Sequence, residues 1–233
     1  MRRVLEGAAD RLFPGGGNEH GALPVALVLL TLVTGFVDAV SYLGLHRVFV
    51  ANMTGNVVLL GFALAGAGNL SAWASALAFG AFMAGAWTVG RLGRRVRRTG
   101  RLFTAVTAVH AALVAAALVV ALTAGHRTVP ARAALIALLG CGMGIQNAVV
   151  RTLGVPDLTT TVLTRTVTGL IADEPGPATV RRVVSLSTMF VGALCGGALF
   201  LHAGAPQALA AAVVLLVVVT AVRGEPPPLR PSA

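Results

Sequence analysis

Residues 35–56 read GFVDAVSYLGLHRVFVANMTGN, and this stretch places an acidic residue and a polar run inside an apolar part of the chain. Asp38 lies within an apolar run that begins near residue 23, and the polar run covers residues 52–56. In a membrane, a carboxylate costs roughly 3 kcal/mol on insertion scales unless it is paired or hydrated. Irregular backbone at that depth is tolerated only where protein buries it or where it lines a cavity. The fold therefore depends on whether this stretch lies in a bilayer.

The composition of the whole chain indicates a membrane protein. Of its 233 residues, 56% are hydrophobic and 11% are charged, whereas soluble domains are about half apolar and about a quarter charged. This excludes a disordered chain, a coiled coil and most soluble enzymes, and it predicts an all-α integral membrane protein. The net charge is +10, and all 18 basic residues are arginine. Because they cluster at the ends of apolar runs, as orientation signals do, we expect no nucleic-acid binding.

Six apolar runs are long enough, or nearly so, to cross the hydrocarbon core, which takes about 20 helical residues. They cover residues 23–45, 71–90, 102–124, 133–152, 183–203 and 206–222. Two further apolar runs, 48–67 and 156–172, are interrupted by polar residues, which in the second run include Asp157, five threonines between residues 159 and 166, and Arg165. By themselves, these two runs could span the membrane fully, return to the side from which they entered, or form distorted helices.

The distribution of arginine favours six crossings. If both interrupted runs cross fully, the cytoplasmic side holds 8 arginines and the outer side holds 9. If each run returns to its own side, the split is 14 inside and 3 outside, with the Arg91–Arg101 loop and both termini in the cytoplasm. Membrane proteins carry an excess of basic residues on the cytoplasmic side. We therefore predict six full crossings plus two re-entrant or broken segments.

The two halves of the chain resemble each other at a nearly constant offset. GFVDAV at 35–40 matches GIQNAV at 144–149, and FMAGA at 82–86 matches MFVGA at 189–193. Three crossings per half is an odd number, so the halves must be inverted repeats of opposite orientation, as in many secondary transporters. The expected organisation is a cytoplasmic polar tail, a first repeat, an external loop, a second repeat and a Pro-rich cytoplasmic tail. These parts cover residues 1–22, 23–124, 125–132, 133–223 and 224–233.

Several of these segments resemble the YoaK-like family of small bacterial inner-membrane proteins. The segments are GFVDAVSY at 35–42, VFVANMTGN at 48–56, GIQNA at 144–148 and DLTTTVLT at 157–164. The resemblance covers about residues 23–222, and it implies a multi-pass fold and a plasma-membrane location but no established substrate. Other members often have an apolar residue where this chain has Arg165, so a role for Arg165 would be peculiar to this subgroup.

Polar residues within the membrane segments are the candidates for binding a substrate or an ion. Asp38 suits a proton or cation relay, a counter-charge for a cation, or a structural cap of a broken segment. Arg165 suits a charge partner of Asp38, an anion-binding group or a side chain that reaches the interface. The amide and hydroxyl groups alternatively satisfy broken backbone or bond between helices. The candidate set is Asp38, Asn52, Thr54, Gly55, Asn56, Gln146, Asn147, Thr161, Thr164 and Thr168, with Arg165 as a possible charge partner.

These features predict a secondary transporter or permease for an unidentified small solute, with its site between the two repeats. The alternative is a membrane scaffold or lipid-binding protein whose Arg91–Arg101 loop contacts anionic headgroups. The sequence has no HExxH, GxSxG or lysine-containing phosphate loop, so we expect neither an enzyme nor a metal or cofactor. The expected partners are the lipid bilayer and the solute. The GxxxG pairs Gly140/Gly144 and Gly192/Gly196, interpreted as helix packing, permit a homodimer without requiring one.

Overall fold

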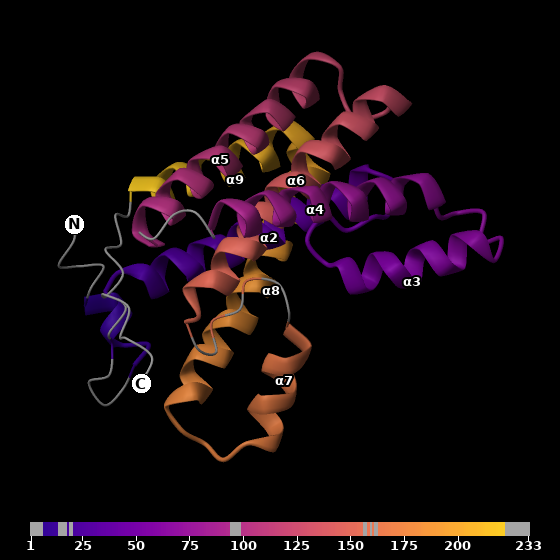
Figure 1. Ribbon diagram of the computed structural model, residues 1–233. Coiled ribbons are helices and arrows are strands. Elements are labelled where there is room, and N and C mark those ends of the chain that lie inside the picture. Colours follow the sequence, from indigo (N-terminus) through magenta and orange to yellow (C-terminus); the bar gives the residue numbers. More distant parts are fainter. Residues whose placement is uncertain are drawn as a thin grey trace.

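The computed structural model describes residues 7–13, 18, 21–93, 99–155, 158, 160 and 163–221, and its regular elements there are all helices. The helices are α2 (Leu23–Gly44), α3 (Met53–Leu64), α4 (Ala72–Gly93), α5 (Thr99–Thr123), α6 (Val129–Leu153), α7 (Leu163–Ala172), α8 (Pro177–Ala203) and α9 (Ala205–Ala221) (Figure 1). The prediction of an all-α fold is confirmed, and each of the eight apolar runs contains one helix. The predicted Pro-rich tail, 224–233, lies outside the described residues.

Among the described residues, five helices are long and apolar enough to cross a membrane: α2, α4, α5, α6 and α8. Helix α9 corresponds to the sixth predicted crossing and has 17 residues, which rise about 26 Å against a hydrocarbon core of about 30 Å. Helices α3 and α7 have 12 and 10 residues, which is too short to cross alone. The two interrupted runs therefore contain short helices. Non-helical backbone precedes α3, and the described residues between α6 and α7 (154, 155, 158 and 160) are also non-helical.

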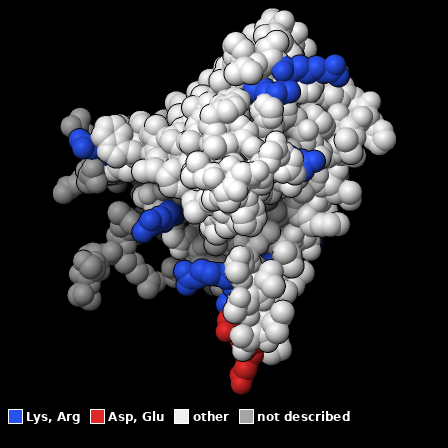
Figure 2. All heavy atoms as spheres, turned by 90° about the vertical axis from the view of Figure 1, so that its right-hand side faces the viewer, with Lys and Arg blue, Asp and Glu red and all other residues white. Residues whose placement is uncertain are grey.

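The outer surface is strongly apolar. Large hydrophobic side chains stand exposed on several helices, among them Phe62, Met83, Phe190 and Leu201. Figure 2 shows a face on which charged side chains are sparse and lie mainly toward its edges. Soluble monomers rarely expose contiguous apolar patches larger than a few hundred Å². The surface, together with the long apolar helices, is that of a multi-pass membrane protein.

Two helices form the centre of the bundle. Helix α2 packs against α8, α9 and α6, and helix α6 packs against α4, α5 and α2. The short helices lie outside this core, where α3 packs on α4 and α7 packs on α8 (Figure 1). The packed pairs correspond between the halves, because exchanging α2 with α6, α3 with α7, α4 with α8 and α5 with α9 converts one set of pairs into the other.

Glycine lets α2 and α8 approach until their backbones touch. A Cβ atom on Gly35 would lie 2.6 Å from the carbonyl carbon of Gly192, and a Cβ atom on Gly192 would lie 2.5 Å from the carbonyl oxygen of Leu32. Cβ atoms do not approach that closely without a shift of the backbone. Any larger residue at these two positions would therefore push the helices apart.

The crossing of α6 and α4 repeats this arrangement with the corresponding residues. A Cβ atom on Gly144 would clash with the carbonyl oxygen of Phe82, and one on Gly85 would clash with the carbonyl oxygen of Cys141. Gly144 and Cys141 lie 109 residues after Gly35 and Leu32, and Gly192 lies 107 residues after Gly85. The glycines of the GxxxG pairs thus pack helices within one chain, as the sequence predicts.

The central helices end differently in the two halves. Helix α6 ends at Leu153 and is capped by Gly154, whose φ of 62° is a left-handed conformation that glycine adopts without a steric penalty. Helix α2 is followed by His46 and Arg47, whose φ values of 66° and 58° are also left-handed. Side chains with a Cβ atom are disfavoured in this conformation by roughly 1–2 kcal/mol. Contacts of residues 45–52, which connect α2 to α3, must therefore compensate for strain that the chain avoids after α6 by having glycine at position 154.

Candidate functional site

Asp38 holds the first link, residues 45–52, against the middle of the bundle. Its buried Oδ1 accepts hydrogen bonds from the backbone N–H groups of Val50, at 3.0 Å, and Ala51, at 2.9 Å. These bonds bring the chain back from the end of α2 to the level of Asp38 before α3 begins. Because buried N–H groups without partners are costly, the contacts give Asp38 the capping role among the alternatives that the sequence left open.

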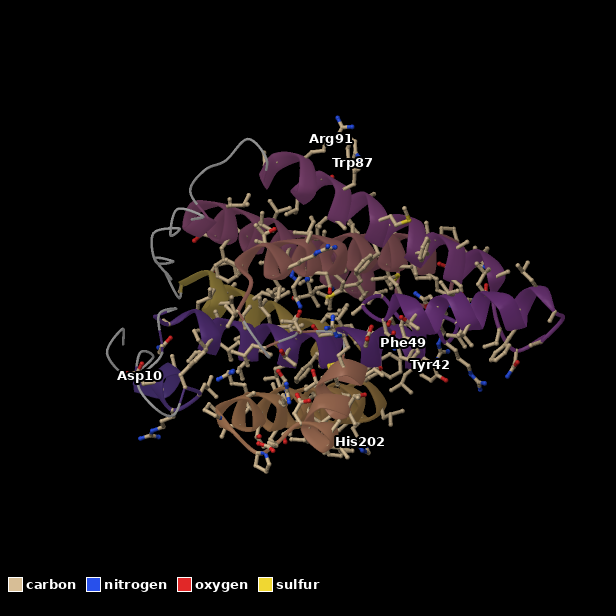
Figure 3. All side chains as sticks on the ribbon, turned by 60° about the horizontal axis from the view of Figure 1, so that its bottom comes forward. Asp10, Tyr42, Phe49, Trp87, Arg91 and His202 are labelled. Atoms are coloured by element: carbon tan, nitrogen blue, oxygen red, sulfur yellow. The ribbon has the colours of Figure 1, made fainter. Side chains whose placement is uncertain are left out.

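Asn56 fixes the same link from the other side. Its Oδ1 accepts from the N–H of Phe49 at 2.9 Å, and its Nδ2 donates to the carbonyl oxygen of Phe49. Asn52 caps α3, since its Oδ1 accepts from the N–H of Gly55 at 3.2 Å. The Phe49 ring also stacks on Tyr42 with 4.9 Å between ring centroids (Figure 3). The first link is therefore bonded along much of its length.

Gln146 joins the two central helices. Its side-chain amide nitrogen, Nε2, donates to Thr34 Oγ1 at 2.9 Å and lies 3.4 Å from the carbonyl oxygen of Leu30. Both Gln146 and Thr34 are buried. Of the alternatives that the sequence left open for Gln146, these contacts favour a bond between helices.

A cavity of about 1240 Å³ lies between the C-terminal parts of α4 and α6, helix α7 and the start of α8. It is also bordered by the described residues between α6 and α7 (154, 155, 158 and 160), which we call the second link. The predicted site residues that line it are Asn147 from α6 and Thr164, Arg165 and Thr168 from α7. Phe82, Ala86 and Gly90 of α4 contribute an apolar wall from the first half of the chain. Both halves therefore border this cavity, while its polar groups come from the second half.

The cavity carries an excess of positive charge. Its lining includes Arg151, Arg165 and Arg182, with Asp173 as the acidic residue among the described lining groups. Arg182 forms an ion pair with Asp173 at 2.7 Å and donates to the carbonyl oxygen of Gly169 at 2.6 Å. Arg151 and Arg165 are exposed. This arrangement leaves the guanidinium groups of Arg151 and Arg165 as the charges that a solute in the cavity could meet.

Comparison with known proteins identifies the family. The chain matches the family described as "Protein of unknown function (DUF1275)" over residues 26–222. The chain belongs to this family. It is also 35% identical to the UPF0700 transmembrane protein YoaK of Bacillus subtilis (strain 168) over 151 residues, which are 64% of this chain and 66% of that protein. No solved structure matches the chain. The resemblance to the YoaK-like family is confirmed, and with it a multi-pass membrane protein of unknown function.

The structure of this DUF1275 protein divides the predicted site residues between two places. Asn147, Thr164, Arg165 and Thr168 line the cavity. The remaining described candidates lie outside its lining. Asp38 on α2 and Asn56 on α3 bond to the first link, Asn52 caps α3 through Gly55, Thr54 is exposed on α3, and Gln146 bonds to α2. Thr161 and Asp157 lie outside the described residues. The structure does not bring Arg165 to Asp38, so the two do not form the charge pair that the sequence suggested.

Two arginines of the cavity were missed because arginine served only as an orientation signal in the sequence. Arg151 and Arg182 counted toward the cytoplasmic side, yet both line the cavity. Arg151 follows Asn147 by four residues, which places the two side chains on one face of a helix. That spacing is the signal that could have identified Arg151. Nothing in the sequence pattern places Arg182, which reaches the cavity from another helix.

The opposite end of the bundle holds a second polar cluster. Arg132 Nη1 lies 2.6 Å from His46 Nε2, and Arg132 Nε donates to the carbonyl oxygen of His126 at 2.9 Å. Burial, followed by the Arg132 charge, holds the pKa of His46 below its ordinary value of 6.5. Burial, then Arg127 and Arg132, lower the pKa of His126 in the same direction. This cluster ties the first link to the loop between α5 and α6 while both rings are neutral.

Proposed function

We propose that this DUF1275 protein is a permease or secondary transporter for a small solute and that the solute binds in the cavity beside α7. The supporting observation is the cavity itself, since both halves of the chain border it and its polar lining stands within an otherwise apolar bundle. Transporter sites commonly lie where discontinuous helices of two repeats meet. The proposal includes no catalytic step.

The proposal treats the halves as inverted repeats with six crossings, α9 being the sixth. Two features support it: the exchange of helix pairs between halves and the glycine crossings built from residues 107 or 109 apart. The cavity then opens at the end of the bundle where α4 and α6 finish. In the proposed orientation this is the cytoplasmic side of the bacterial inner membrane, because the arginine-rich stretch 91–101 follows α4.

Topology is tested first, by labelling single cysteines in a background with Cys141 and Cys195 replaced by alanine. We place cysteines at Gly68 and Gly125, and at Arg98 and Asp173. A membrane-impermeant thiol reagent added to whole cells is expected to label the first pair only. Labelling of position 173 from outside would contradict inverted halves, because it would require α7 to cross the membrane.

Solute passage is tested by osmotic swelling of liposomes that contain the purified full-length protein, with a panel of small neutral and charged solutes. We expect Thr164→Trp, which fills the cavity from α7, to slow swelling several-fold. Val167→Trp on the same helix is the matched control, because Val167 is exposed and is not among the residues that line the cavity. Swelling equal to that of empty liposomes for every solute would contradict the permease proposal.

Asp38 separates two versions of the mechanism. If its carboxyl group relays protons, Asp38→Asn abolishes pH-coupled flux although the protein still inserts. If Asp38 acts through its bonds to Val50 and Ala51, the amide oxygen of asparagine retains an acceptor and flux persists. The contacts favour the second result. Loss of pH coupling in a well-folded Asp38→Asn protein would establish the relay instead.

A scaffold or lipid-binding role is the second candidate function. Its supporting observation is Arg91, whose guanidinium lies 4.5 Å from the centroid of the exposed Trp87 ring at the end of α4 (Figure 3). Such pairs suit the headgroup region. Arg94, Arg95, Arg97 and Arg98 lie outside the described residues. If this role holds, Arg91→Gln lowers binding to anionic vesicles, whereas the permease proposal predicts unchanged solute flux in that variant.

A further inference from the structure

We propose that the cavity beside α7 is an anion site, in which Arg151 and Arg165 bind a small oxyanion of the phosphate, sulfate or carboxylate class. This inference rests on the proposed function and names the substrate class of the same cavity. The shared chemistry is an oxygen-rich anionic group, which could belong to a free solute or to a lipid headgroup.

The strongest support comes from the corresponding positions in the two halves. Helices α3 and α7 begin at Met53 and Leu163, so Gly55 corresponds to Arg165 at the offset of 110. A Cβ atom on Gly55 would lie 3.0 Å from the Phe49 ring, and this position in the first half has no room for a long side chain. In the second half the same position carries an exposed guanidinium that lines the cavity.

The central helices α2 and α6 also differ in charge, with the more positive residues in the second half. At the offset of 109, Asp38 corresponds to Asn147 and Tyr42 corresponds to Arg151. The second half therefore has a neutral amide in place of a buried acid, and a guanidinium in place of a phenol. At the offset of 107 between α4 and α8, the buried Ser75 corresponds to Arg182. Each of these replacements makes the second-half position more positive than its first-half counterpart.

The ion pair of Arg182 leaves the other two arginines as the binding charges. Asp173 and the carbonyl oxygen of Gly169 occupy the Arg182 guanidinium, which braces α7 against α8. No ion pair of Arg151 or Arg165 is found among the described residues. Arginine presents several N–H donors in a planar fork that matches oxyanions, and the Thr164 hydroxyl on the neighbouring position of α7 adds a further donor.

The acidic groups among the described residues near the cavity do not cancel this charge. Asp173 forms an ion pair with Arg182, and Glu174 is exposed on the turn between α7 and α8. Acidic atoms lie at the lower end of the molecule in Figure 2, at the height of that turn in Figure 1. The described lining thus carries three arginines against one aspartate. In a partly apolar cavity such an excess attracts anions more strongly than it would in bulk water.

The first experiment measures the local charge with the full-length protein, using matched cysteines in the background lacking Cys141 and Cys195. Thr164→Cys lies at the cavity, and Thr54→Cys lies at the corresponding position on α3; both threonines are exposed. We compare reaction rates with an anionic and a cationic methanethiosulfonate reagent. The anionic reagent is expected to gain about tenfold in relative rate at position 164 over position 54. Equal ratios at the two positions would overturn the anion site.

The second experiment measures binding, using inorganic phosphate as the probe at constant ionic strength. The protein is held in nanodiscs of phosphatidylcholine, and its thermal midpoint is followed as phosphate is added. Arg151→Gln and Arg165→Gln are each expected to raise the half-saturating concentration about tenfold or more. Arg127→Gln, an exposed arginine at the opposite end of the bundle, is the control and should leave it unchanged. A phosphate effect that is the same in all four proteins would overturn the proposal.

A third arm identifies the source of the anion. If nanodiscs containing phosphatidylglycerol stabilise the protein in an Arg165-dependent manner while phosphate does not, the site holds a lipid headgroup and the anion chemistry stands. If phosphate binds through both arginines but liposomes show no flux of any anion, the site stands and the permease proposal fails. If liposomes pass a neutral or cationic solute and phosphate binding ignores both arginines, the permease stands and the anion site fails.

Discussion

The two interrupted segments occupy corresponding places in the bundle but are used differently. In the first half, Asp38 and Asn56 bond the link to α2 and α3, and Val50 is completely buried. In the second half, the link and α7 border a cavity of about 1240 Å³ whose charged lining includes Arg151 and Arg165. The corresponding segments of the two halves thus differ: the first is bonded to its neighbouring helices, and the second borders a polar cavity.

The difference teaches that a polar residue at membrane depth is not by itself a binding residue. Asp38 is the most conspicuous polar residue in the sequence, yet backbone N–H groups occupy its Oδ1 atom. Arg165 lies on the short helix α7, and it lines the cavity. Whether a buried polar group serves structure or a ligand depends on whether its bonding capacity is already used within the chain.

The largest effect is expected from opening the pinned segment with Asp38→Ala. This removes the acceptor of two buried N–H groups, and each unpaired group costs about 1–3 kcal/mol. Asp38→Asn keeps an oxygen at the same place and should cost clearly less. Thermal unfolding in detergent measures both variants. Equal, small losses in the two would mean that the first link does not depend on Asp38.

The glycine crossings should show equal sensitivity in the two halves. Gly85→Ala and Gly192→Ala each force a Cβ atom into the backbone of the partner helix, at an expected cost of about 1–3 kcal/mol in unfolding free energy. Gly80→Ala is the control on α4, because a Cβ atom there meets nothing within 4 Å and alanine gains up to about 1 kcal/mol in helix propensity. A Gly85→Ala protein as stable as Gly80→Ala would refute the close crossing.

After α6 and α2, removing a glycine and introducing one should change the free energy of unfolding by about 1 kcal/mol each, in opposite directions. Gly154→Ala should destabilise the protein, because a φ of 62° is unfavourable for a residue with a Cβ atom. Nothing lies within 4 Å of such a Cβ atom, so the effect comes from the backbone conformation alone. Arg47→Gly should stabilise, since the φ of 58° is left-handed. Both effects are visible in the midpoint of chemical unfolding. A change of the same sign in both variants would show that backbone strain is not the difference between the two ends.

The smallest effect concerns pH and the contact between His46 and Arg132. The folded state holds the pKa of His46 below 6.5, so the unfolded chain binds a proton more readily. Stability is therefore unaffected well above pH 6.5 and falls as the pH drops through that value toward the lower folded pKa. As the pH is lowered from about 8 to 5, the thermal midpoint of His46→Gln should fall less steeply than that of the wild-type protein.

His126 supplies the control for this measurement. Its pKa is lowered in the same direction, so a residual slope should remain in His46→Gln and should diminish further in the double variant with His126→Gln. Identical midpoints across the pH range for the wild-type protein would refute the neutral histidine cluster.

Much of the fold could be predicted from the sequence because the bilayer makes strong demands on composition. The predicted run 23–45 became α2, from Leu23 to Gly44, and the run 183–203 forms the main part of α8. A helix must satisfy its own backbone in lipid, so long apolar runs have few alternatives. The polar interruptions also distinguished the two runs that contain the short helices α3 and α7, but they did not give the bounds of these helices.

The sequence by itself determined the apolar helices, the positions of the two interruptions and the glycines through which helices cross, because lipid and close packing each restrict which residues are allowed. Only the tertiary structure decided which polar side chains already have hydrogen-bond partners within the chain. The distinction between Asp38, bonded to backbone twelve and thirteen residues away, and Arg165, facing a cavity lined by four helices, arises from long-range contacts. Local pattern reports the kind of side chain, but only the folded chain brings its partners within hydrogen-bond distance.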